Sequence, residues 1–130
     1  MSDIVGKWFA QSVYDFQTAK AMFRSRRYIY AVFMCHLSLE KALKGLVTAV
    51  TGEIPPRTHN LIYLTKLAQP KLSKKHTAFL ATINTASIVT RYPEDLETAL
   101  KEFNRKMVKN YIRVTEEVLK CLYQDPRLKK

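Results

Sequence analysis

The sequence has little glycine, no long hydrophobic run and no basic segment at its start. Three Gly and five Pro in 130 residues exclude a collagen-like or low-complexity chain. No apolar run approaches the ~18 residues that a membrane-spanning helix needs, and Ser2 and Asp3 follow Met1 where a signal peptide would be basic. We therefore expect a cytoplasmic protein without a membrane partner.

Cysteine is also scarce, because only Cys35 and Cys121 are present. Both occupy apolar positions of helical patterns, so we interpret them as buried small hydrophobes rather than as a disulfide or a nucleophile. The chain has no Cys-x-x-Cys, His-x-x-x-His or Glu-x-x-His pair, so we expect no metal. It also has no P-loop, dinucleotide fingerprint or Gly-x-Ser-x-Gly, and we expect no cofactor.

Acidic residues are half as frequent as basic ones. Eleven Asp and Glu face twenty-two Lys and Arg, giving a net charge of +11 and a sequence pI near 9.8. Such a field attracts polyanions and favours a phosphate-bearing partner, although a merely solvated surface is the alternative. Two basic clusters are the natural footprint for RNA: Arg24, Arg26 and Arg27, and Lys71, Lys74, Lys75 and His76.

What the chain has in abundance is apolar residues at helical spacing. Intervals of three and four predict helices over 3–24, 28–51, 59–68, 74–90 and 94–123. Helix 28–51 has the widest apolar face and should be central; Thr58 and Ser73 are candidate N-caps. No segment alternates with period two, so we predict an all-α bundle of three long helices, one moderate and one short helix. It forms a single domain over 1–127, followed by a basic tail, 128–130.

Three places carry side chains that could do chemistry. His36, Glu40 and Lys44 lie four apart on one face of helix 28–51, where they could transfer protons or orient a phosphate, or simply form a solvated stripe. Arg57 and His59 flank the start of the short helix, which suits an anion but is equally a structural turn.

Arg91, just before Tyr92 and Pro93, could hydrogen-bond the last carbonyls of its helix or reach across to Glu40. Prolines beside both segments should bend the chain back toward helix 28–51. We therefore predict a shared pocket in which Arg91 pairs with a partly buried Glu40, formed by Glu40, Lys44, His59, Arg91 and Tyr92.

Four segments of the chain form one pattern by their order and spacing. They are Trp8, Asp15 and Ala19; Tyr28-x-x-Ala31-x-Phe33-x-x-His36-x-x-x-Glu40-Lys41-x-x-Lys44; Pro55-x-x-Thr58-His59-Asn60-Leu61-x-x-Leu64; and Arg91-Tyr92-Pro93. Together they resemble the HEPN family (higher eukaryotes and prokaryotes nucleotide-binding domain). The resemblance covers about residues 3–123. It implies an all-α, commonly homodimeric protein, often paired with a minimal nucleotidyltransferase in a toxin–antitoxin system.

Many relatives are metal-independent RNases with an Arg-x4-6-His motif, and this chain departs from that pattern. The nearest match, Arg105-x4-Asn110, has Asn where His would stand, and Asn takes no proton at neutral pH. The sequence therefore favours a nucleotide- or RNA-binding module over an RNase with an atypical site built from His59, Arg91 and Tyr92. The predicted binding residues are Glu40, Lys41, Lys44, Arg57, His59, Arg91, Arg26, Arg27, Lys74 and Lys75.

Overall fold

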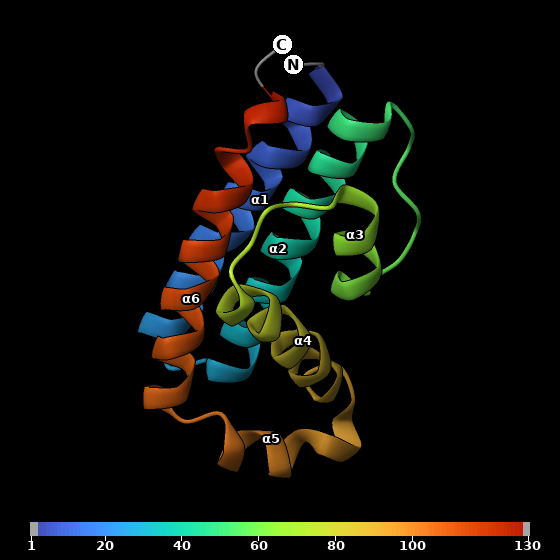
Figure 1. The fold of residues 1–130 in the computed structure, drawn as a ribbon. Coiled ribbons are helices and arrows are strands. Elements are labelled where there is room, and N and C mark those ends of the chain that lie inside the picture. Colours follow the sequence, from blue (N-terminus) through green and yellow to red (C-terminus); the bar gives the residue numbers. More distant parts are fainter. Residues whose placement is uncertain (1–2, 129–130) are drawn as a thin grey trace.

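A computed structural model describes residues 3–128, and this part of the chain is helical throughout, without strands. Three long helices run side by side along the molecule, while three shorter ones cover one flank and one end (Figure 1). The all-α bundle predicted from periodicity is thus confirmed. The elements are α1 (Asp3–Arg24), α2 (Tyr28–Thr51), α3 (Leu61–Ala68), α4 (Lys74–Val89), η1 (Pro93–Asp95), α5 (Leu96–Glu102), α6 (Arg105–Tyr123) and η2 (Pro126–Leu128).

Helix α2 is the centre of the bundle, as its apolar face predicts. It packs against α1, α6, α3 and α4, and Cys35, Leu39, Leu43 and Leu46 are fully buried along it. A helix that contacts neighbours on several sides cannot keep a polar stripe in water. For that reason the polar side chains of α2 must find partners inside the protein.

Helices α1 and α2 approach each other closely because small residues line their contact. Ser12 Oγ donates to the Ser38 carbonyl at 2.8 Å, and Ser38 Oγ donates back to the Ser12 carbonyl at 2.7 Å. Further along the same contact, a Cβ on Gly45 would lie only 2.9 Å from Cε1 of Phe9. These contacts lock the two helices in one register.

The prediction of one continuous helix over 94–123 is wrong, because the chain is interrupted before α6. The chain forms η1 and α5, breaks at Phe103 and Asn104, and then starts α6. Asn104 is the N-cap of α6, because its backbone is extended and its side chain accepts from the Met107 N–H at 2.9 Å. Phe103 is buried at the break, whereas Leu100 is 62% exposed.

Two smaller expectations also need correction. The N-cap of α3 is Asn60, whose side chain accepts from the N–H groups of Ile62 and Tyr63; Thr58 instead accepts from the Asn60 N–H at 3.1 Å. The short helix therefore begins two residues later than predicted. Cys35 is buried as expected, but Cys121 lies exposed near the end of α6, and both are free thiols.

Candidate functional site

A pocket of about 360 Å³ opens where α2, the segment before α3 and the end of α4 meet. Two proline-bounded segments bring the site together, as expected from the sequence: Pro55 and Pro56 precede the turn to α3, and Pro93 follows α4. The volume lies in the range of small-molecule sites. The polar and aromatic side chains among its lining residues are His36, His59, Asn60, Asn84, Ser87, Arg91 and Tyr92.

Glu40 anchors one side of the site from the interior of α2, where only 2% of the residue is exposed. Its carboxylate accepts a hydrogen bond from Lys44 Nζ at 3.0 Å and another from His59 Nδ1 at 2.9 Å. Both bonds are needed, because a buried carboxylate without partners is strongly destabilising. The helical spacing supplies Lys44, and the turn after the prolines delivers His59.

His36 is buried beside this group, with its Nδ1 4.0 Å from Glu40 Oε1. Burial is the largest influence and lowers the pKa of His36 from 6.5 to about 4, with Arg91 adding in the same direction and Glu40 opposing it. The imidazole is therefore neutral at physiological pH. Its Nδ1 is buried without a hydrogen-bond partner.

Arg91 does not form the predicted pair with Glu40. Its guanidinium lies over the ring of Phe33, 4.8 Å from the centroid, and within residues 3–128 the basic groups within 4.0 Å of the Glu40 carboxylate are those of His36, Lys44 and His59. Stacking holds the guanidinium by its face, so its N–H groups stay available. Nη2 of Arg91 is buried and has no hydrogen-bond partner.

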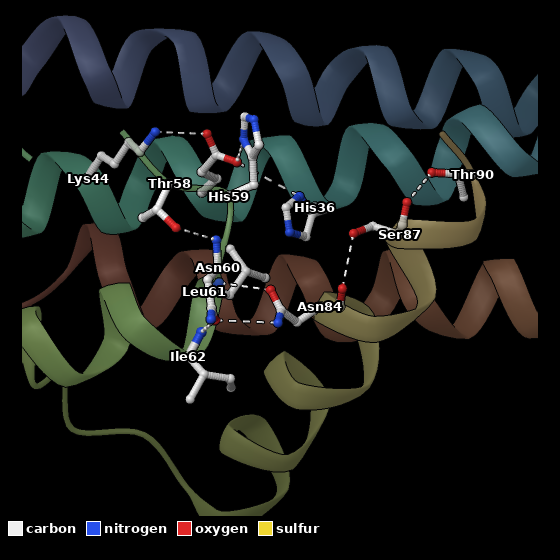
Figure 2. Close-up of polar contacts among 11 residues, drawn as sticks. His36, Lys44, Thr58, His59, Asn60, Leu61, Ile62, Asn84, Ser87 and Thr90 are labelled. Atoms are coloured by element: carbon white, nitrogen blue, oxygen red, sulfur yellow. Dashed lines mark hydrogen bonds and ion pairs between the residues drawn. The ribbon is translucent and has the colours of Figure 1, made fainter. Parts of the chain in front are cut away.

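Two asparagines fix the opposite wall (Figure 2): Asn60, which belongs to the Thr58-His59-Asn60-Leu61 segment, and Asn84, which sequence reasoning did not single out. Asn84 Oδ1 accepts from the Leu61 N–H at 2.8 Å, and Asn84 Nδ2 donates to Asn60 Oδ1 at 3.4 Å. The first bond orients the Asn84 amide and joins α4 to the start of α3. Helical spacing places Asn84 on the side of the buried Leu80, four residues earlier, but that spacing does not reveal its partners at the start of α3.

Glu40 and Lys44 do not line the pocket as predicted; Glu40 holds His59, which does line it, and Lys44 pairs with Glu40. The other six predicted binding residues do not line the pocket either. Lys41 is half-buried on α2 and acts electrostatically on the buried Asp15 of α1. The remaining five are exposed and do not line the pocket: Arg57 before α3, Arg26 and Arg27 between α1 and α2, and Lys74 and Lys75 at the start of α4. Lys75 also contacts Glu117 at 3.7 Å.

Within residues 3–128, no three or more His, Cys, Asp or Glu side chains lie close enough together to hold a metal ion. In the same range, no helix is long and apolar enough to cross a bilayer. The chemistry that the pocket offers is therefore that of its side chains: one cation with a free N–H, two imidazoles, of which that of His36 is neutral, and two oriented amides. Such a set can bind an anionic group together with a polar ring or sugar.

Comparisons with known proteins agree with this architecture. The sequence profile of the HEPN domain matches residues 5–125. The solved structure of TT1696 from Thermus thermophilus is similar, with a TM-score of 0.81 and 18% identity over 95% of this chain and 98% of that one. ST0689, an archaeal HEPN homologue, gives a TM-score of 0.69 and 17% identity over 95% and 97% of the two chains. No curated protein matches the chain significantly.

Proposed function

The chain belongs to the HEPN domain family, and we propose that it binds a nucleotide or RNA whose phosphate sits against Arg91. The observation that carries the proposal is the partnerless Nη2 of Arg91 in a residue that lines the 360 Å³ pocket. A buried N–H without an acceptor is costly, and a phosphate oxygen is the acceptor that an arginine fork suits best.

The surroundings of Arg91 support the same ligand class. Asn60 and Asn84 present amides, which can read the edge of a base or a ribose hydroxyl. The net charge of +11 raises the local concentration of polyanions around the whole molecule. The exposed clusters at Arg26 and Arg27 and at Lys74 and Lys75 would add screened, sequence-independent attraction for a longer RNA.

The test compares Arg91→Gln with a matched control that also removes one positive charge. Lys7→Gln serves as the control, because Lys7 is exposed on α1 and pairs only with the exposed Asp3 within the described residues. Losing a charged hydrogen bond to phosphate should weaken nucleotide binding about tenfold to a hundredfold in Arg91→Gln, while Lys7→Gln binds as the wild type does.

Titration calorimetry with the four ribonucleoside monophosphates and a short RNA provides the measurement. Circular dichroism and thermal melting must accompany it, because Arg91 also packs on Phe33. Equal affinities of the two folded variants would contradict the proposal. So would affinity for RNA that is independent of salt, because phosphate contacts release counterions.

The proposal extends to a homodimer that works with a minimal nucleotidyltransferase in a toxin–antitoxin-type pair, as the resemblance to small prokaryotic members implies. A groove of about 540 Å³ supports a protein partner, since Phe23 and Ile112 line it together with five cationic side chains: Lys20, Arg24, Lys106, Lys109 and Arg113. Light scattering should give the mass of a dimer, and the product of a neighbouring nucleotidyltransferase gene should co-purify. A monomeric protein that does not bind the nucleotidyltransferase would contradict this extension of the proposal.

A second candidate function, metal-independent RNA cleavage, is favoured by the Glu40–His59 contact. His59 Nδ1 lies 2.9 Å from Glu40 Oε1; a ring that donates this N–H and carries no proton on Nε2 would have the Nε2 lone pair for accepting a proton. Arg91 in the same pocket would stabilise charge on the phosphorane, and Tyr92 lines the pocket beside it. Labelled RNA incubated with chelator should be cut by the wild type and by His76→Ala but not by His59→Ala. If the RNA stays intact in every reaction, this second candidate function is wrong.

A further inference from the structure

A second, smaller cavity shares a wall with the first. It has a volume of about 230 Å³ and is lined by Tyr30, Leu96 and Pro93, together with the same Arg91 and Tyr92 that line the larger pocket. Arg91 and Tyr92, which come after the C-cap of α4 at Thr90, therefore contribute to both cavities. Neither the exposed Tyr30 nor this second cavity was part of the site expected from the sequence.

The side chains of the two cavities differ in kind. The larger one presents the amides of Asn60 and Asn84 and the neutral imidazole of His36. The smaller one presents the aromatic and aliphatic groups of Tyr30, Ile29 and Leu96, and no acidic residue lines it. The larger cavity can recognise a polar edge by hydrogen bonds, whereas the smaller one offers the ring of Tyr30 beside aliphatic side chains.

We propose that the two cavities bind two successive nucleotides of a single-stranded nucleic acid, with the linking phosphate at Arg91. This inference rests on the proposed function, because it uses the same arginine as the phosphate site. Arg91 lines both cavities and its Nη2 has no hydrogen-bond partner within the protein, and a phosphodiester is the group that separates two bases along a strand.

We assign a base to the smaller cavity because two exposed tyrosines, Tyr30 and Tyr92, line it. Tyr30 is 55% exposed and Tyr92 is 50% exposed, although large aromatic side chains are usually more buried. Aromatic rings at the surface of a basic protein are the platforms on which unpaired bases stack, and stacking accepts any base because each has a π-face. We therefore expect base selectivity from the asparagine-lined cavity and tolerance in the tyrosine-lined one.

The experiment compares ligands of one and two nucleotides on the same variants. Probes are the four nucleoside monophosphates and 5′-phosphorylated dinucleotides, each in ribose and deoxyribose form so that RNA and DNA are distinguished. Wild-type protein should bind dinucleotides more tightly than monophosphates. Tyr30→Ala should weaken dinucleotide binding about 5- to 100-fold, leave the monophosphates unchanged, and recover with Tyr30→Phe.

Tyr14→Ala is the matched control, since Tyr14 is a 69% exposed tyrosine on α1 that lines neither cavity. Dinucleotides that bind no better than monophosphates, or equal affinities of Tyr30→Ala and Tyr14→Ala, would overturn the two-cavity inference and leave the phosphate site at Arg91 standing. Failure of every probe to bind would instead overturn the proposed function itself.

Discussion

The buried imidazole of His36 should make this protein sensitive to acid. The pKa of His36 falls from 6.5 to about 4 on folding, mainly because burial disfavours the charged ring. A folded-state pKa below the unfolded value means that the unfolded chain binds the proton more tightly. The contribution of the neutral His36 ring to the free energy of unfolding is therefore fully present above pH 6.5 and is lost as the pH falls toward 4.

The size of the loss follows from the gap of about 2.5 pH units between the two pKa values. Each unit corresponds to about 1.4 kcal/mol, so His36 should cost the folded state about 3 kcal/mol between pH 7.5 and pH 4. For a domain of this size, that is a large part of the total free energy of unfolding. The loss should be visible as a shift of the urea midpoint.

Urea unfolding of wild type and His36→Gln at both pH values isolates this contribution, because other groups titrate in both proteins. Asp15 is one of them; burial raises its pKa, so its protonation stabilises the fold on acidification, with the opposite sign to His36. The wild type should lose about 3 kcal/mol relative to the variant. A His36 ring that titrates near pH 6.5 by NMR, or parallel losses in both proteins, would refute the reasoning.

Two substitutions on α2 test the packing that positions the site. Leu39→Ala should lower the free energy of unfolding by about 2–5 kcal/mol, because Leu39 is fully buried at the centre of the helix; a loss below about half a kcal/mol would contradict the central place of α2. Gly45→Ala should cost about 1–3 kcal/mol, although Ala favours helix, because its Cβ would meet Phe9 at 2.9 Å. A gain in stability would show that α1 can move aside.

The sequence predicted α1 and α2 with the bounds that the structure has, but its periodicity did not indicate the break before α6. Apolar residues keep intervals of four and three across the whole of 94–123, and a pattern with intact period cannot reveal that the chain changes direction. The break depends on Asn104, which can cap a helix, and on the burial of Phe103. Capping competes with helix continuation locally, whereas burial is decided by the rest of the fold.

The site was predictable where one helix or one turn sets the geometry. Helical spacing places Lys44 beside Glu40, and the proline-bounded turn places His59 there as well. The contact of Asn84 with Leu61 and the stacking of Arg91 on Phe33 could not be predicted from such local spacing. Their contacts join α4 to α3 and α2, and the relative placement of those helices depends on packing that no local pattern contains.

The error about Arg91 has a physical cause that bears on function. The Glu40 carboxylate already accepts hydrogen bonds from Lys44 and His59, so the guanidinium of Arg91 would add little attraction there at the cost of its own desolvation. Stacking on Phe33 holds the guanidinium by its π-face and leaves its Nη2 donor unused. Had Arg91 paired with Glu40, its charge would be largely neutralised. Because it does not, the pocket keeps an oriented positive charge, which is what a phosphate site requires.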